Sequence, residues 1–498
     1  MKNIIEYLEN SIKKYSNKIC IKQDSEQITF NDLRNKARKL GSLIGRKNLF
    51  KSPIVVFMDK SINAIVSFLG VAYSGNFYIP IDIEMPSNRI KKILNTLNSK
   101  VIVTTKDNFE NIKCISGEYD IIYIEDIINE IEDEELLEYI QSKCIDTDLL
   151  YVLFTSGSTG EPKGVTISHK SVIDYIEWVT KTFKISDNDI FGNQAPFYFD
   201  NSILDIYCTI KCGSTLDLIP KKLFSFPIEL LNYIENRKIN TIFWVPTALI
   251  YVANLKALDK VNVTTLNKIL FCGEVMPNKH LNLWRNKFKD CLFANLYGPT
   301  EITDVCTYYI IDRPFSDNEP LPIGIPCENT DIFILNEDNE LINNSFEIGE
   351  LYIRGTSLSF GYYNNIDKTN ENFIQNPLNS SYREIVYKTG DLVKYNEYNE
   401  LLFVCRKDSQ IKHRGFRIEL GEIEAIINSV EEIKQCCCLY DDERKKIVLF
   451  YSSDIDINNS TFKDILPEYM IPNKFIKLDN FPLTLNGKIN RLELKQYF

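Results

Sequence analysis

The feature that most constrains this chain is a glycine-rich stretch directly after an apolar run. The run, Leu149–Phe154, is typical of a buried strand, and the stretch reads Thr-Ser-Gly-Ser-Thr-Gly-Glu-Pro-Lys-Gly from Thr155. Its glycines allow the backbone to come close to a ligand, and its hydroxyls and lysine supply donors. Such a segment is suited to phosphate oxygens. The predicted phosphate ligands are Thr155, Ser156, Gly157, Ser158, Thr159, Gly160 and Lys163.

The spacing differs from that of the Walker loop. Starting from Gly157, the Walker pattern requires Gly-Lys at 162–163, but position 162 is Pro162. A flexible polar turn after a strand is the alternative interpretation. The length and particular composition of the string favour a dedicated phosphate loop.

Composition excludes several classes of function. The 498 residues allow two or more domains, and 44% hydrophobic with 25% charged residues is typical of a soluble globular protein. No apolar run approaches the ~18 residues of a membrane span. The net charge of −11 argues against a general nucleic-acid binder. We therefore expect no membrane and no nucleic-acid partner.

The cysteines and histidines predict no metal site. The thirteen cysteines are scattered, which indicates free thiols in a reducing cytosol. The cluster Cys436–Cys438 would alternate between the faces of a strand and cannot form one tetrahedral site. The three histidines show no zinc spacing. His169 is expected to have a structural role, orienting loop backbone, rather than to act as a general base.

The order of elements predicts the fold class. Strand-like and helix-like segments alternate up to about residue 310, which indicates α/β architecture with parallel sheets. Within this part, Asn31 is predicted to cap a helix over 28–45. From about 320 the segments become shorter and β-rich. We expect a large domain at 1–405, with helices on parallel-type sheets plus a β-rich subdomain, and a small α+β domain at 406–498.

A set of motifs occurs in a fixed order along essentially the whole chain. After the phosphate loop come Phe199-Asp200, Tyr297-Gly-Pro-Thr-Glu301, Gly349-Glu-Leu-Tyr-Ile-Arg-Gly355, Tyr387-Lys-Thr-Gly-Asp391, Arg414-Gly-Phe-Arg-Ile-Glu-Leu-Gly-Glu422 and Asn486-Gly-Lys488. The set resembles the amino-acid adenylation enzymes of the acyl-adenylate-forming superfamily, in the free-standing form of nonribosomal-peptide-synthetase adenylation domains. The segments Gln194-Ala-Pro-Phe and Phe271-Cys-Gly-Glu-Val-Met-Pro are similar to the D-alanine–carrier protein ligases.

This resemblance implies ATP and Mg²⁺ as cofactors and assigns roles to individual residues. The phosphate loop would hold the β- and γ-phosphates, Tyr297 would face adenine, and Thr300 would contact the α-phosphate. Glu301 would bind Mg²⁺, and Asp391, backed by Arg406, would bind the ribose. Lys488 would approach the carboxylate and the α-phosphate. The catalytic residues are thus Lys488, Thr300 and Glu301, and the remaining nucleotide positions are Gly273, Glu274 and Gly298.

The resemblance also implies an amino-acid pocket. Its Asp200 would bind the α-ammonium of the substrate, and the alternative is that Asp200 only caps a helix. The predicted pocket residues are Asp200, Asn201, Leu204, Phe243, Leu270, Cys272, Leu296, Asp304 and Val305. The apolar members favour a small side chain. Asp304 favours a basic one if it faces the pocket, whereas D-alanine fits if Asp304 turns to solvent or binds backbone.

The expected activity is formation of aminoacyl-AMP with release of pyrophosphate, followed by transfer to the phosphopantetheine thiol of a separate carrier protein. A D-alanine–carrier protein ligase, an acyl- or aryl-CoA ligase and a degenerate nucleotide-binding scaffold are the alternatives. The resemblance implies that the small domain is mobile, with a hinge near Asp408. The family usually has glycine where this chain has Cys405, which is a departure from the family pattern at the domain joint. A monomeric, cytoplasmic, free-standing enzyme is expected.

Overall fold

The computed structural model describes residues 1–108, 119–155, 161–317, 319–407, 410–428, 430, 432–482 and 489–498, without the side chains at 425 and 434. Most of the phosphate loop (156–160), Asp408 and Lys488 therefore lie outside the described residues.

The first sheet has six strands and is parallel except at one edge, where β7 and β8 are antiparallel. Helices α2 (Phe30–Gly45), α3 (Ile62–Tyr73), α4 (Ser87–Leu97) and α6 (Glu134–Lys143) accompany it. In spatial order its strands are β6 (Asp120–Tyr123), β5 (Val101–Thr104), β3 (Pro53–Phe57), β4 (Phe77–Ile81), β7 (Leu149–Thr155) and β8 (Lys163–Ser168).

The second sheet has nine strands, parallel at its centre and antiparallel at both edges. Its strands are β15 (Ile325–Pro326), β14 (Thr307–Ile310), β13 (Leu292–Tyr297), β12 (Lys268–Cys272), β11 (Thr241–Trp244), β9 (Ile190–Asn193), β10 (Thr215–Leu218), β1 (Ile19–Gln23) and β2 (Glu26–Thr29). The helices along this part are α1 (Ile5–Tyr15), α7 (His169–Thr182), α8 (Asn201–Cys212), α9 (Pro227–Arg237), α10 (Pro246–Asn254), α11 (Ala257–Lys260) and α12 (Asn278–Lys287).

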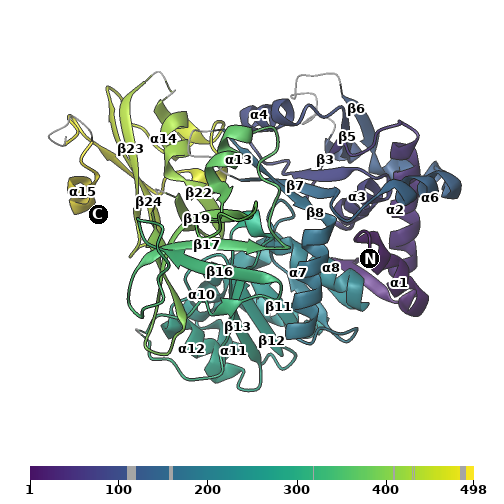
Figure 1. The fold of residues 1–498 in the computed structure, drawn as a ribbon, viewed down its shortest axis with the longest axis horizontal. Coiled ribbons are helices and arrows are strands. Elements are labelled where there is room, and N and C mark those ends of the chain that lie inside the picture. Colours follow the sequence, from purple (N-terminus) through teal and green to yellow (C-terminus); the bar gives the residue numbers. More distant parts are fainter. Residues whose placement is uncertain are drawn as a thin grey trace.

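The main hydrophobic core lies between these two sheets, where α7 and α8 pack side by side (Figure 1). Alternate residues of a strand belong to different cores because successive side chains point to opposite faces. On β12, Leu270 belongs to the central core, whereas Ile269 and Phe271 pack against α9–α12 on the other face. The apolar strands predicted from the sequence are therefore covered on both sides.

A five-stranded antiparallel sheet and a C-terminal unit complete the chain. The sheet contains β16 (Thr330–Leu335), β17 (Gly349–Gly355), β18 (Phe373–Gln375), β19 (Ile385–Tyr395) and β20 (Leu401–Arg406), with α13 (Ile366–Asn372) beside it. The C-terminal unit has its own core. Its elements are β21 (Gln410–His413), β22 (Phe416–Glu419), α14 (Leu420–Asn428), β23 (Ile433–Asp441), β24 (Lys446–Ser453), β25 (Lys474–Lys477) and α15 (Arg491–Leu494).

The predicted α/β class with a β-rich part and a C-terminal α+β unit is confirmed. Cys437 lies in a different hydrophobic cluster from Cys436 and Cys438, as alternation along a strand requires. Every cysteine that the structure describes is a free thiol. None of the described helices is long and apolar enough to cross a membrane.

The prediction that Asn31 caps a helix was wrong. Helix α2 begins at Phe30, and the Thr29 hydroxyl accepts from the Asp32 N–H at 3.1 Å. Phe30 is fully buried, so the apolar stripe of the helix starts before Asn31.

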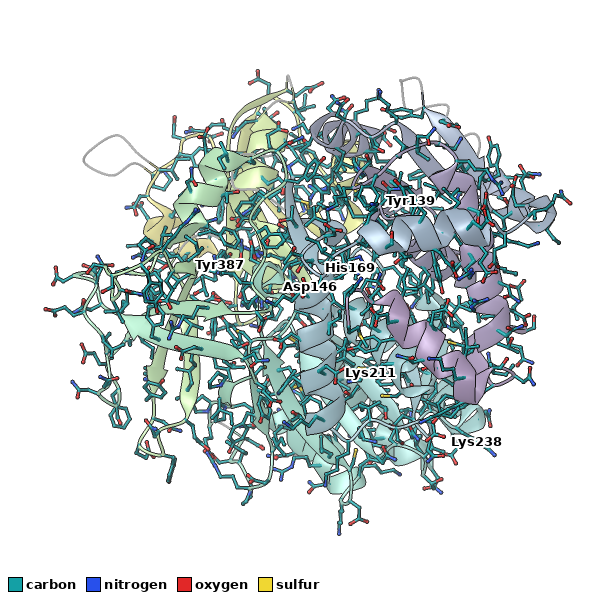
Figure 2. All side chains as sticks on the ribbon, turned by 45° about the vertical axis from the view of Figure 1, so that its right-hand side comes forward. Tyr139, Asp146, His169, Lys211, Lys238 and Tyr387 are labelled. Atoms are coloured by element: carbon teal, nitrogen blue, oxygen red, sulfur yellow. The ribbon has the colours of Figure 1, made fainter. Side chains whose placement is uncertain are left out.

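His169 has the structural role that we expected, although its partner is the N-terminal segment. Its Nδ1 accepts from the Ile4 N–H at 3.2 Å, and the ring is buried at the start of α7, close to Asp146 (Figure 2). Burial lowers the pKa of His169 to about 4. The folded protein therefore holds this imidazole neutral.

The His169 pKa predicts a pH dependence of stability. The unfolded chain binds a proton near pH 6.5 and the folded chain near pH 4, so the unfolded state carries more protons between these values. Stability falls as pH falls through this window, with a slope from His169 approaching about 1.4 kcal/mol per pH unit. His169→Gln should remove this component in urea titrations at several pH values, and the partly exposed His280→Gln should change the slope less. Equal slopes in wild type and His169→Gln would contradict this.

Candidate active site

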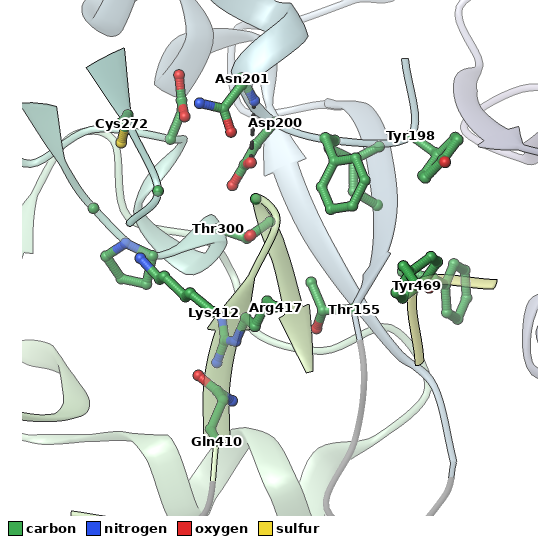
Figure 3. A pocket seen from close by; sticks show the side chains of 18 of the residues that line it. Thr155, Tyr198, Asp200, Asn201, Cys272, Thr300, Gln410, Lys412, Arg417 and Tyr469 are labelled. Atoms are coloured by element: carbon green, nitrogen blue, oxygen red, sulfur yellow. Dashed lines mark hydrogen bonds between the residues drawn. The ribbon is translucent and has the colours of Figure 1, made fainter. Parts of the chain in front are cut away.

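A cavity lies where the carboxyl ends of central strands meet the C-terminal unit (Figure 3). Ligands typically bind at such strand ends in open α/β sheets. Strands β7, β12 and β13 end at this cavity, α8 begins beside it, and the hairpin β21–β22 forms another wall. The predicted site residues that line it are Thr155, Asp200, Asn201, Cys272, Gly273, Gly298, Thr300, Asp304, Asp391 and Arg406.

Asp200 lines the cavity and also caps α8. One carboxylate oxygen accepts from the Asn201 N–H at 3.1 Å, and only 9% of the residue is exposed. Burial raises the pKa of Asp200, whereas the Thr300 hydroxyl and the Lys412 ammonium act in the opposite direction. The two interpretations of Asp200 are therefore compatible, since a capping carboxylate can also face a ligand.

Glu301 is fully buried and both of its oxygens are occupied. Arg417 of the C-terminal unit donates to Oε2 at 2.6 Å, and the Tyr362 hydroxyl donates to Oε1 at 2.7 Å. Burial would raise the pKa of Glu301, but Arg417 and Lys163 outweigh it and lower the pKa to about 2. The carboxylate is ionised and held by a guanidinium.

This arrangement does not fit the Mg²⁺ role predicted for Glu301. A magnesium ion requires free oxygen ligands, and those of Glu301 are held by Arg417 and Tyr362. Among the described residues, no group of three or more His, Cys, Asp or Glu side chains could hold a metal ion.

The predicted ribose and adenine residues are linked to each other. Arg406 donates to Asp391 Oδ1 at 2.8 Å, and the Tyr297 hydroxyl donates to Asp391 Oδ2. The ammonium of Lys412 lies 5.6 Å from the centre of the Tyr297 ring. Tyr297, 6% exposed, therefore contacts a cation in this arrangement.

The two ends of the predicted phosphate loop are partly buried Thr155, which lines the cavity, and buried Lys163. The Thr155 hydroxyl is buried without a hydrogen-bond partner, which suits it to a ligand oxygen. Lys163 lies 3.8 Å from Glu419 and 5.4 Å from the centre of the Tyr362 ring. Burial lowers the pKa of Lys163.

Of the predicted site residues that the structure describes, nine do not line the cavity, and Lys163, Tyr297 and Glu301, described above, are among them. Leu204, Phe243, Leu270, Leu296 and Val305 are buried in the central core, because hydrophobic neighbours cover them on all sides. Glu274 accepts from the Thr247 backbone at 2.9 Å and from the Gly415 N–H at 2.8 Å. Glu274 thus joins the large part of the chain to the C-terminal unit.

Sequence reasoning missed the cavity residues of the C-terminal unit and their partners. Gln410, Lys412 and Arg417 line the cavity from β21–β22, and Arg89 of α4 forms a buried ion pair with Glu422 of α14. The only signal was the motif Arg414–Glu422, to which no site role was assigned. Charged residues on short strands are mostly exposed, so the pattern alone did not single them out.

Comparisons with known proteins identify the family of this chain. Residues 8–363 match the family described as AMP-binding enzyme. The chain is 30% identical to tyrocidine synthase 1 of Brevibacillus parabrevis, over 99% of this chain but 45% of that protein, so it spans less than half of that relative. It is 30% identical to the D-alanine--D-alanyl carrier protein ligase of Staphylococcus haemolyticus, over 100% of this chain and 99% of the ligase.

Solved structures show the same fold. The Vibrio cholerae adenylation domain AlmE, in complex with glycyl-adenosine-5'-phosphate, superposes with a TM-score of 0.86 at 20% sequence identity, covering 100% of this chain and 98% of that one. The family match extends over more than half of the chain and includes strands β7, β12 and β13, which end at the cavity. This chain belongs to the AMP-binding enzyme family.

Proposed function

We propose that this protein uses ATP to activate an amino acid as aminoacyl-AMP, releases pyrophosphate, and transfers the aminoacyl group to the phosphopantetheine thiol of a carrier protein. The observation that carries the proposal is the buried Asp200 carboxylate in the cavity wall beside Thr300. A carboxylate in such a place is costly unless a cation pairs with it, and an α-ammonium supplies one. The carboxylic-acid substrate of an acyl- or aryl-CoA ligase carries no ammonium group that could pair with Asp200.

The remaining lining residues suit the nucleotide half of the reaction. The Thr155 hydroxyl at the end of β7 offers a donor for phosphate oxygens, and Lys163, paired with Thr155 at the start of β8, offers an ammonium beside the cavity. Asp391, oriented by Arg406, offers a carboxylate for ribose hydroxyls. When ATP is bound, the substrate carboxylate attacks its α-phosphate, and catalysis requires positioning and charge stabilisation.

Transfer to a carrier in trans is supported by the relatives. The D-alanine--D-alanyl carrier protein ligase matches this chain over almost the full length of both. We propose that the large unit is 1–405 and the small one 406–498, and that the small unit reorients about a joint near Asp408 between the two half-reactions. Cys405, directly before this joint, is exposed.

A D-alanine–carrier protein ligase is the second candidate. Cys272 of the similar Phe271–Pro277 segment lines the cavity, as expected if it lies against a small substrate. For either candidate we propose a monomer that acts in the cytoplasm, in accord with the charge of −11 and the free thiols.

Amino-acid-dependent exchange of pyrophosphate into ATP tests the proposal. A screen over L- and D-amino acids should find exchange with a small set of them and none with fatty or aryl acids. Transfer is then measured as a covalent aminoacyl thioester on a phosphopantetheinylated carrier protein. Exchange driven by carboxylic acids without an amino group would overturn the assignment.

Asp200→Ala should impair amino-acid use more than ATP use. The substrate ammonium loses a charge-assisted hydrogen bond of about 1.5–3 kcal/mol, which is roughly ten- to hundredfold in kcat/KM. Because Asp200 also caps α8, Asp133→Ala is the matched control. Asp133 caps α6 by accepting from the Leu136 N–H at 3.1 Å, away from the cavity. Equal kinetics in wild type and Asp200→Ala would mean that Asp200 is only a helix cap.

A further inference from the structure

A second carboxylate lines the same cavity as Asp200. Asp304 follows the end of β13 in a backbone turn, with φ of 59° at Thr303 and 73° at Asp304. The residue is 2% exposed, and its Oδ2 accepts from the Tyr175 hydroxyl at 2.6 Å. Asp304 therefore does not turn to solvent, and its hydrogen-bond partner is a side chain of α7.

Within the described part of the chain, neither Asp200 nor Asp304 forms an ion pair. Burial raises the pKa of Asp304 well above its usual range, and the nearby charge of Asp200 adds to the effect. Lys412 acts in the opposite direction on both acids without bonding to either. Burying two carboxylates in one enclosed space costs free energy unless cations pair with them.

Near the two carboxylates lie two side-chain polar atoms that have no hydrogen-bond partner among the described residues. The side-chain nitrogen of Asn201, 7% exposed, lines the cavity and is buried without a hydrogen-bond partner (Figure 3). The Tyr151 hydroxyl likewise has no hydrogen-bond partner among the described residues, although Tyr151 does not line the cavity. Burial raises the pKa of Tyr151, and the nearby charges of Asp200 and Asp304 raise it further. The Asn201 amide group is a donor and therefore suits a ligand oxygen, such as that of the substrate carboxylate. It marks the cavity as a polar binding site, and the choice of a cationic side chain rests on the two carboxylates.

The space beyond these groups is closed. Leu270, Leu296 and Phe243 belong to the packed central core and do not line the cavity. Cys272 and Asp304 therefore lie where the cavity meets the core, and a long side chain would displace packed atoms. The cavity therefore has room only for a short substrate side chain, and acidic groups line it.

We propose that the substrate is an amino acid whose short side chain ends in a second ammonium group, with the α-ammonium at Asp200 and the side-chain ammonium at Asp304. This inference rests on the proposed amino-acid activation and names its substrate class. Diaminopropionate, diaminobutyrate and ornithine belong to this class. In the complex each buried carboxylate has its own cation, which removes the repulsion between the acids.

The test is pyrophosphate exchange with both enantiomers of alanine, serine, diaminopropionate, diaminobutyrate, ornithine and lysine. Wild type should use a short diamino acid with higher kcat/KM than alanine or serine. Asp304→Asn, which keeps the shape and removes the charge, should lower kcat/KM for that diamino acid by about ten- to hundredfold and leave alanine near wild type.

The matched control is Asp217→Asn. Asp217 is also a buried aspartate that accepts from a tyrosine hydroxyl, Tyr233, at 2.6 Å. It differs from Asp304 in pairing with Arg237 at 3.1 Å and in lying on β10 outside the cavity. This variant should keep the wild-type order of substrates. If Asp304→Asn does not fold, the order of kcat/KM values among the amino acids in wild type decides whether the substrate is a short diamino acid.

Two results would overturn the inference and can be told apart. A wild-type preference for alanine, retained in Asp304→Asn, would reject charge pairing and leave amino-acid activation standing. Exchange with no amino acid at all would reject the proposed function, and the substrate class with it.

Discussion

Replacing Lys488 by alanine is expected to slow amino-acid-dependent pyrophosphate exchange by a factor of about 10²–10³. In the motif Asn486-Gly-Lys488, the lysine is the positive charge assigned to the substrate carboxylate and the α-phosphate. Negative charge develops on the phosphates as pyrophosphate leaves, so the loss falls mainly on the transition state. Lys488 lies outside the described residues, and its role is assigned from the motif alone.

The fold of Lys488→Ala should remain intact, because one side chain near the end of the small unit is removed. Thermal unfolding should therefore match wild type while exchange is nearly lost. Lys495→Ala, an exposed lysine of the same terminal segment, is the control and should retain full exchange. Exchange at the wild-type rate in Lys488→Ala would contradict the assignment.

The architecture could be predicted because it depends on local patterns. Apolar runs that end in small and polar residues indicated buried parallel strands, and β7, β12 and β13 have that form. The alternation of Cys436, Cys437 and Cys438 followed from strand geometry alone. The start of α2 was wrong by two residues, since Thr29 and not Asn31 caps the helix and Phe30 already belongs to its apolar stripe.

The walls of the cavity could be predicted only in part. Asp200, Cys272 and Asp304 are placed by the ends of elements, and these lie where the motifs indicated. Whether Leu204 or Phe243 lines the cavity depends on how distant elements pack against each other. A short sequence pattern carries no information on that packing. The pairing of Glu301 with Arg417 joins residues 116 positions apart and had no local signal.

Contacts between the two units of the chain are concentrated at the cavity. Glu301 pairs with Arg417, Arg89 with Glu422, and Glu274 accepts from the Gly415 N–H. These contacts hold the hairpin β21–β22 against the strand ends. The same carboxylate that the motif assigns to Mg²⁺ therefore contributes to docking, so the two roles exclude each other at any one moment.

Glu301→Gln is accordingly expected to destabilise the docked arrangement by about 3–5 kcal/mol, because the buried Arg417 guanidinium loses the charge of the Glu301 carboxylate. The small unit can escape this cost by leaving the cavity, which exposes the hairpin to water. Amide hydrogen exchange of Gly415, whose N–H donates to Glu274 at 2.8 Å, reports this opening. Its rate should rise by roughly a hundredfold or more at pH 7.

Glu328→Gln removes an ion pair of similar length, 2.8 Å to Lys181, but on the exposed surface. That control should cost less than about 1 kcal/mol and leave Gly415 protected. Unchanged protection of Gly415 in Glu301→Gln would show that the buried pair does not hold the two units together.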